Sequence, residues 1–171
     1  MGFALAADSW YALQVKVNHE IRVAAALQSK GYETFVPLYK TTRRWSDRLK
    51  CLDRPLFPSY AFCRFNPEIK HGIVSTPNVT RIVGFGRRPV PVDTAEIDSL
   101  KIALISGQTC EPHPVLGIGQ KVRVVDGPLA GLKGILLAEA RKKRIVISVT
   151  LVQKAVAVEV DAQSVLIDSA A

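Results

Sequence analysis

Between residues 9 and 107, short runs of aromatic and β-branched residues alternate with segments whose apolar residues recur every three or four positions. The first pattern is typical of strands and the second of helices. Asn18 is predicted to cap the first helix, and Gly31 to close it. The alternation predicts a small sheet with helices packed on one face, an α+β fold. The predicted strands are 9–15, 34–39, 59–65 and 79–85, and the predicted helices follow Asn18, Asn66 and Asp93.

The polar segment 41–54, TTRRWSDRLKCLDR, interrupts this alternation and carries five basic against two acidic residues. Its weak alternation predicts a projecting arm or hairpin, and a solvated basic loop is the alternative interpretation. Pro37, just before the segment, places the preceding strand near a sheet edge or a bulge, because proline cannot donate to a central ladder.

From residue 106 onward the pattern changes. The stretch GQTCEPHPVLGIG has prolines and glycines without a period, which is typical of a linker. After it, five short β-branched runs at nearly even spacing predict a small barrel, a fold that leaves few exposed edges. We therefore predict a first domain over 8–106, a linker over 107–117 and a barrel domain over 118–169.

The chain of 171 residues has a formal net charge of +8 and a pI near 9.6, which favours an anionic partner such as nucleic acid. Its three cysteines are scattered without a CxxC pair, which argues against a zinc site or disulfide framework and fits a reducing cytosol. The N-terminal apolar run lacks a basic n-region, and no stretch approaches the roughly 20 apolar residues that span a bilayer. We expect a soluble, cytoplasmic, monomeric protein that makes no membrane contact.

No motif in the sequence indicates catalysis. The three histidines lie far apart without an HExxH spacing, and neither a GxxxxGK[ST] phosphate loop nor a G-x-S-x-G elbow is present. The glycine pairs at 84–86 and 117–119 lack the third glycine and the strand-to-helix setting of a dinucleotide site. We expect no enzyme activity, no metal and no cofactor.

Aromatic residues concentrate in the stretch RPLFPSYAFCRF, residues 54–65. Strand parity places Tyr60 and Phe62 on one face and Ala61, Cys63 and Phe65 on the other. Because helices cover only one face of a small sheet, the face with Tyr60 and Phe62 is left for another surface, as at an interaction site. The alternative is that both aromatic residues belong to an ordinary core.

The stretch GQKVRVVDGPLAGLKGILLAEA contains the most specific local signal. Asp126, Gly127 and Pro128 follow one strand, and Gly131, a basic residue and Gly134 lead into the next, as expected for a tight turn with positive φ angles. The stretch resembles the KOW motif of the SH3-like barrels found in transcription and translation factors.

With this motif, the order of elements in the first half resembles the N-terminal domain of the NusG family. The Trp10-Tyr11 strand, PLFPSY, the helix behind Asn66-Pro67 and VTRIVGFG occur in the family's order. The stretch PLFPSYAFCRFNPE, followed by His71, resembles the specialised RfaH-like paralogues more than it resembles general NusG. The resemblance runs from about Ser9 to Ile167 and implies an antiparallel, ferredoxin-like sheet with helices, then a five-stranded KOW barrel.

Such a resemblance implies binding to RNA polymerase through an apolar hollow that receives the clamp helices of the largest subunit. The residues it assigns to this contact are Phe57, Pro58, Tyr60, Phe62 and Phe85. It places a second polymerase contact at His71, although Gly72 and the residues after it lack the hydroxyls of the paralogues' motif.

Two further contacts are implied by the resemblance. Non-template DNA would meet basic residues through backbone phosphates, a salt-sensitive and sequence-blind contact. The KOW barrel would bind the termination factor Rho or a ribosomal protein. The DNA contact is assigned to Lys16, Arg22, Arg43, Arg44 and Arg48, and the KOW contact to Leu151, Val152 and Lys154.

Together these features predict a transcription elongation factor that modulates pausing and termination as a specialised antiterminator. The density of Val and Ile in the barrel favours strand over helix and predicts a constitutive barrel without a fold switch. A ribosome-associated KOW protein that binds RNA through the RKKR segment, residues 141–144, is the alternative function.

Overall fold

The computed structural model describes residues 8–45, 48–86, 88–113, 119–138, 143–160 and 164–167. The chain divides into two compact units, Met1–Val36 with Phe57–Thr94 and Pro37–Leu56 with Ala95–Ala171. No helix in the described residues is long and apolar enough to cross a bilayer. Each unit is described in turn.

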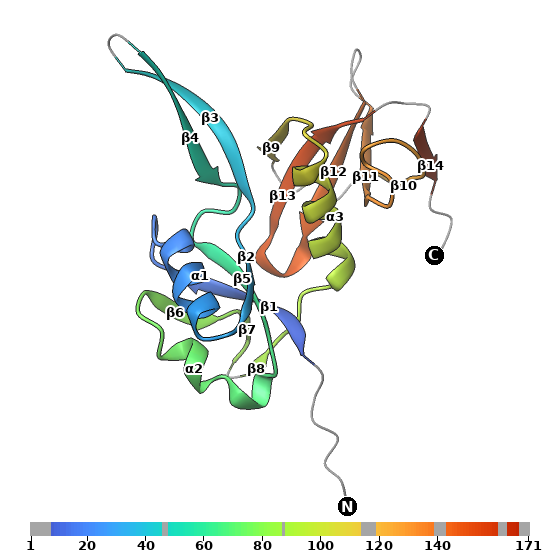
Figure 1. Ribbon diagram of the computed structural model, residues 1–171. Helices are drawn as coiled ribbons and strands as arrows, with labels where there is room; N and C mark the ends of the chain where they lie inside the picture. Colours follow the sequence, from blue (N-terminus) through green and yellow to red (C-terminus); the bar gives the residue numbers. More distant parts are fainter. Residues whose placement is uncertain are drawn as a thin grey trace, which may run out of the picture. The chain divides into compact units, whose positions relative to one another are not determined.

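The first unit is built on a four-stranded antiparallel sheet in the order β2-β5-β1-β6 (Figure 1). This order is that of a ferredoxin-like sheet, as predicted. The sheet strands are β1 (Ser9–Val15), β2 (Glu33–Phe35), β5 (Tyr60–Phe65) and β6 (Val79–Ile82). The remaining elements of the unit are α1 (Glu20–Ser29), η1 (Pro67–Ile69), α2 (His71–Val74), β7 (Gly84–Phe85) and β8 (Arg88–Pro89).

The core of this unit lies between the sheet and its helices. Ala61, Cys63 and Phe65 of β5 form one buried cluster with Val23 and Leu27 of α1. Ile73 of α2 belongs to the same cluster, so both helices cover one face of the sheet. The predicted strand parity is therefore confirmed for this inward face.

The ends of α1 match the predictions in part. Gly31 follows the helix with φ +89°, and its N–H donates to the carbonyl of Gln28 at 2.9 Å, as expected of a closing glycine. The prediction that Asn18 caps the helix is wrong, since His19 holds that position and makes no side-chain cap. Asn18 instead adopts φ 63°, a conformation that asparagine reaches more readily than most residues.

Two single strands predicted in the first half are each divided. The strand predicted over 34–39 breaks at Val36 and Pro37, where β2 ends and β3 (Leu38–Trp45) begins. The strand predicted over 79–85 breaks after Ile82, and β7 pairs with β8 instead of continuing the four-stranded sheet. Proline has no N–H for a ladder, which accounts for the first break.

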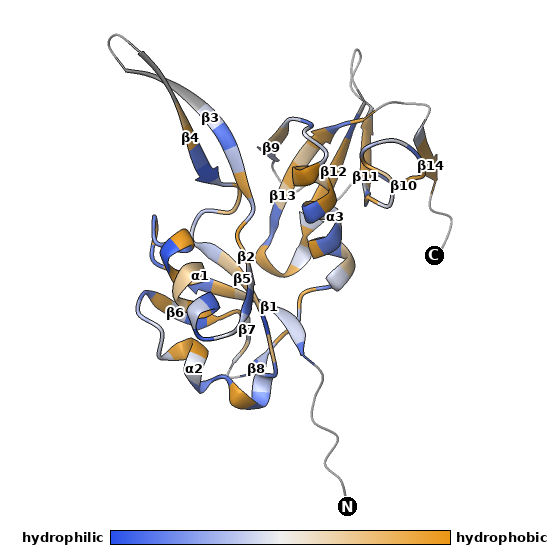
Figure 2. Ribbon diagram, viewed as in Figure 1, coloured by the Kyte–Doolittle hydropathy of each residue, from blue (hydrophilic) through white to orange (hydrophobic). Residues whose placement is uncertain are grey.

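The polar segment forms the predicted hairpin. Strand β3 pairs along its whole length with β4 (Arg48–Pro55), from Leu38 opposite Pro55 to Trp45 opposite Arg48. The two strands form a separate two-stranded ribbon (Figure 1). The end of β4, at the base of the hairpin, is strongly hydrophilic (Figure 2).

The second unit contains a six-stranded antiparallel sheet in the order β14-β10-β11-β12-β13-β9. All five strands predicted for the KOW barrel are present, and a sixth extends the sheet beyond β13. Strands β12 and β13 are largely hydrophobic along their length (Figure 2). The strands are β9 (Cys110–His113), β10 (Gln120–Val124), β11 (Lys133–Ala138), β12 (Lys143–Val149), β13 (Lys154–Glu159) and β14 (Val165–Ile167).

The connection between β10 and β11 has the predicted turn chemistry. Gly127 and Gly131 adopt φ +80° and +90°, and the Asp126 carboxylate accepts the Gly127 N–H at 2.7 Å. The Gly131 N–H donates to the carbonyl of Val124, whose own N–H donates to the carbonyl of Leu132, both at 2.9 Å. These bonds hold the turn against the strands.

The segment predicted as a linker, 107–117, is partly strand. Cys110–His113 forms β9, whose one proline, Pro112, is tolerated because the strand lies at a sheet edge. Cys110 is buried, which ties the strand to the unit. Residues 114–117 lie outside the described part of the chain.

Helix α3 (Thr94–Ile105), predicted as part of the first domain, groups with the second unit from Ala95 onward. The Ser99 hydroxyl accepts the N–H of Lys133 at 3.1 Å. One carboxylate oxygen of Glu96 accepts both the N–H and the hydroxyl of Thr150, at 3.2 and 2.8 Å. These bonds join the helix to the start of β11 and to the loop after β12.

Candidate functional site

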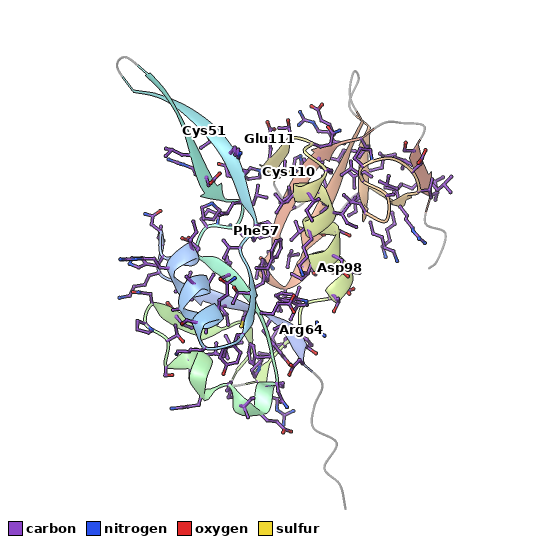
Figure 3. The ribbon with its side chains drawn as sticks, in the orientation of Figure 1. Cys51, Phe57, Arg64, Asp98, Cys110 and Glu111 are labelled. Atoms are coloured by element: carbon purple, nitrogen blue, oxygen red, sulfur yellow. The ribbon has the colours of Figure 1, made fainter. Side chains whose placement is uncertain are left out.

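The turn that leads into β5 has an unusual backbone. The Tyr60 N–H donates to the carbonyl of Phe57 at 3.1 Å, which closes a four-residue turn with Pro58 in the second position. Ser59, in the third position, has φ 70°. Proline followed by a residue with positive φ is the pattern of a type II turn, in which glycine is the usual third residue. The turn places Phe57 just before β5 (Figure 3).

Both backbone groups of Ser59 are hydrogen bonded. Its carbonyl accepts the N–H of Val15 at 2.9 Å, and its N–H donates to Glu20 Oε1 at 2.7 Å. Glu20 lies in the first turn of α1 and is only 3% exposed. The carboxylate therefore joins the start of α1 to the turn between Phe57 and Tyr60.

Three phenylalanine rings gather next to this turn. Phe57 meets Phe62 edge to face at a centroid distance of 6.0 Å, and Phe35 lies 6.2 Å from Phe62. In the strand register Phe62 pairs with both Ala12 and Phe35, on the face away from the α1 cluster. The outward side of the predicted parity is therefore aromatic.

The expectation that this aromatic face is exposed needs a correction. Phe57 and Phe62 are both 0% exposed, and only Tyr60 is half-buried. Their contacts with each other and with Phe35 explain part of this burial, since aromatic rings pack edge to face or tilted. Phe57 and Phe62 therefore lie beneath any contact surface formed here, and Pro58 is exposed beside them.

Phe85 is the exposed aromatic residue among those predicted for the contact. It is 80% exposed, at the end of the two-residue strand β7. Gly86 follows with φ +59°, which turns the chain directly after the ring. Among the residues assigned to the contact, Phe85 is therefore the ring that another molecule can reach.

His71 is exposed at the start of α2, and the next residue ties the helix to its surroundings. The Gly72 carbonyl accepts hydrogen bonds from the Lys30 ammonium at 3.0 Å and from the Thr76 hydroxyl at 2.9 Å. Lys30 also donates to the Thr76 hydroxyl at 2.7 Å. This network holds α2 against the end of α1.

Two of the predicted DNA-contacting residues are exposed, one directly after β1 and one in the first turn of α1. Lys16 and Arg22 are solvent-exposed, and neither has an acidic partner among the described residues. The backbone of Lys16 donates to the carbonyl of Asn78 at 3.0 Å, which fixes its position beside β6. The side chains of Arg43, Arg44 and Arg48 lie outside the described part of the structure.

The predicted KOW contact falls on a short 3-10 turn, η2 (Thr150–Val152), after β12. Leu151 is half-buried, Val152 is buried and Lys154 is exposed at the start of β13. Gln153 adopts φ 52° between them. Residues 141–142 of the RKKR segment lie outside the described residues.

Sequence reasoning missed Glu20 and Ser59. A glutamate at the start of a helix is ordinary, because its charge suits the helix N-terminus. The available signal was the Pro-Ser pair before a strand, which is compatible with a type II turn. In the described residues, no three His, Cys, Asp or Glu side chains are arranged to hold a metal ion.

Known proteins are similar to this chain along most of its length. The model of the family described as transcription termination factor NusG matches residues 8–101. The termination/antitermination protein NusG of Thermus thermophilus is 27% identical over 178 residues, covering 92% of this chain and 97% of that protein. The Escherichia coli K12 NusG is 28% identical over 166 residues, covering 89% and 92%.

A solved structure shows the same fold. A structure that describes domain interaction in the NusG of Thermotoga maritima aligns with this chain with a TM-score of 0.53 and 21% identity. The alignment covers 92% of this chain and 96% of that one. Because the family model matches more than half of the chain, and the relatives align along nearly its whole length, this chain belongs to the NusG family.

Proposed function

We propose that this chain is a transcription elongation factor that binds RNA polymerase and modulates pausing and termination. The observation that carries the proposal is the family match over residues 8–101, which contains the aromatic turn, β5 and Phe85. The relatives that align with the chain are named as termination/antitermination proteins. The proposed action is non-enzymatic, through added contacts that stabilise the elongating polymerase.

The proposed polymerase contact lies on the first unit and combines the turn before β5 with the exposed ring at the end of β7. Phe57 and Phe62 form the buried floor, while Pro58, Tyr60 and Phe85 supply the accessible apolar surface. The partner would be the clamp helices of the largest polymerase subunit, because a helix presents an apolar side to such a surface. His71 would add a second contact from the exposed start of α2.

Lys16 and Arg22 are proposed to contact non-template DNA. Both are exposed cations, and their contacts to phosphate would guide the strand without reading its sequence. Arg43, Arg44 and Arg48 on the hairpin are proposed to add to this attraction.

The KOW unit is proposed to bind a second protein, Rho or a ribosomal protein, through Leu151, Val152 and Lys154. Lys154 is exposed and Leu151 is half-buried, so both are accessible, while the side chain of Val152 is buried. As part of the proposal the polymerase-binding domain spans 8–106, since the family match reaches into α3, and the KOW domain spans 118–169. Of the segment 107–117 between them, β9 pairs with the KOW sheet.

Among the functions of the family we favour a specialised, RfaH-like antiterminator, because the stretch from Pro55 to Glu68, followed by His71, resembles those paralogues more than general NusG. The test is transcription by purified core polymerase on a template with a pause site and an intrinsic terminator. Antitermination predicts shorter pauses and more read-through when the protein is added. More termination would overturn the antiterminator role, and no effect at saturating protein would overturn the elongation-factor role.

A further inference from the structure

Glu20 is a buried carboxylate with a specific backbone partner. It is 3% exposed, and its Oε1 accepts the N–H of Ser59 at 2.7 Å, across 39 positions of sequence. A buried carboxylate costs free energy unless it is hydrogen bonded, and a bond from a backbone N–H to a charged acceptor is among the stronger kinds. The position is therefore unusual for a residue that acts only as a helix former.

The partner, Ser59, occupies a backbone conformation that L side chains rarely adopt. Its φ is 70°, and glycine would hold this angle without steric conflict. The Val15 N–H binds its carbonyl from the sheet and Glu20 binds its N–H from the helix. These two bonds hold Ser59 from both sides in a conformation that it would not favour alone.

The turn fixed in this way presents the proposed contact surface. Phe57 precedes Ser59 in the turn and packs against Phe62, while Pro58 is exposed beside it. A surface that is ordered before binding loses less conformational entropy when the partner arrives. The order of this edge depends on the conformation of Ser59.

We propose that Glu20 is a positioning residue for polymerase binding, which holds the Phe57–Tyr60 turn in its binding conformation through the Ser59 N–H. The inference rests on the proposed function, since it assigns Glu20 a role at the proposed polymerase contact. Glu20 itself does not have to touch the polymerase.

Glu20→Met tests the role, because methionine fills similar space but cannot accept the Ser59 N–H. Glu20→Gln is the matched control, since its amide oxygen still accepts. Glu20→Met combined with Ser59→Gly is the rescue, because glycine adopts the positive φ without the carboxylate. The readouts are affinity for core RNA polymerase and the hydrogen-exchange rate of the Ser59 amide in the free protein.

For Glu20→Met we expect amide exchange at Ser59 to accelerate by about tenfold or more and polymerase affinity to fall by about tenfold, the scale of one charge-assisted hydrogen bond. Glu20→Gln should keep both values within about threefold, and the double variant should recover most of the affinity. Amide exchange in the β1–β5 ladder should stay unchanged in all three variants.

Wild-type affinity in Glu20→Met would overturn the inference. So would global unfolding of Glu20→Met without recovery by Ser59→Gly, since that result assigns Glu20 a general packing role. If the wild-type chain itself fails to bind polymerase, the proposed function fails. In that case unchanged Ser59 exchange in Glu20→Met would separately show that Glu20 does not hold the turn.

Discussion

The ring of Phe57 meets the ring of Phe62 edge to face, with 6.0 Å between centroids and 81° between ring planes. Phe57 lies in the turn before β5 and Phe62 lies within the strand, so the contact fastens the turn to the sheet. Residues assigned to a partner contact are thus also part of the folded core. Any test of that contact has to separate weaker binding from lower stability.

Phe62→Ala should lower the free energy of unfolding by about 3–5 kcal/mol, the usual cost of removing a buried phenylalanine side chain. Phe62→Leu should cost less than about 1.5 kcal/mol, because it leaves a smaller cavity. Urea unfolding followed by circular dichroism measures both. A cost below about 1 kcal/mol for Phe62→Ala would contradict the burial of this ring.

The KOW turn predicts that two glycines respond differently to substitution. Gly127 has φ +80° and open space around it, so Gly127→Ala should cost about 1–2 kcal/mol and Gly127→Asn less, since asparagine tolerates this conformation. At Gly134 an added Cβ would lie 2.6 Å from the carbonyl oxygen of Val146 on the paired strand. Gly134→Ala should therefore cost more than Gly127→Ala.

Asparagine substitutions distinguish backbone strain, the expected cause at Gly127, from steric overlap, the expected cause at Gly134. Gly134→Asn should destabilise at least as much as Gly134→Ala in urea unfolding. Rescue by asparagine at 134, or failure of asparagine to improve on alanine at 127, would contradict the explanation.

The three cysteines predict a pattern of thiol reactivity. Burial, and secondarily the negative charge of Glu33, raises the pKa of Cys63 from 9.0 to about 12, and burial raises the pKa of Cys110. Cys51 is exposed on the hairpin. At pH 8 a thiol reagent should modify Cys51 in the folded protein, and the other two thiols only after denaturation. Rapid labelling of Cys63 in the native state would contradict its burial.

The same pKa shift predicts a loss of stability in alkaline solution. Below pH 9.0 the Cys63 thiol is protonated in both states, and its contribution is fully present. Between pH 9.0 and about 12 only the unfolded chain ionises, so the free energy of unfolding falls. Cys63→Ala should make this fall shallower without removing it, because burial also raises the pKa of Tyr11.

Lys16→Gln combined with Arg22→Gln should weaken binding to single-stranded DNA and make it less sensitive to salt. The slope of log affinity against log salt should fall by about 0.7 for each phosphate that is no longer neutralised. Because both residues are exposed, stability should change by less than about 0.5 kcal/mol. Lys121→Gln combined with Arg123→Gln removes the same charge from exposed positions on β10 and is the control. Equal reductions in the two pairs would show a general charge effect.

Much of the fold was predictable because local patterns carry it. Alternation along β5 predicted that Ala61, Cys63 and Phe65 face the helices, since parity is a property of any strand. The KOW turn was predictable because Asp126 and its glycines are adjacent in sequence. In both cases the interacting groups lie within a few residues or a fixed period of one another.

The features that sequence reasoning missed depend on distant contacts. The bond between Glu20 and Ser59 joins positions 39 residues apart, and nothing near either residue indicates the other. The burial of Phe62 was left open, between an interaction face and an ordinary core, because parity tells which face a ring occupies, not what covers it. The sixth strand was missed because its four residues, CEPH, include a proline and no β-branched residue.

The central claim, that the first unit binds polymerase through Pro58, Tyr60 and Phe85, is tested most directly at Phe85. Phe85 is 80% exposed, so Phe85→Ala removes contact area without a cavity, and Ile105→Ala, at an 84% exposed residue on α3, is the matched control. Affinity for core RNA polymerase is measured by titration for wild type and both variants. We predict that Phe85→Ala weakens binding about 30-fold, the scale of an interface hot spot, and that Ile105→Ala leaves it unchanged. Wild-type affinity in Phe85→Ala, or equal weakening in both variants, would contradict the claim.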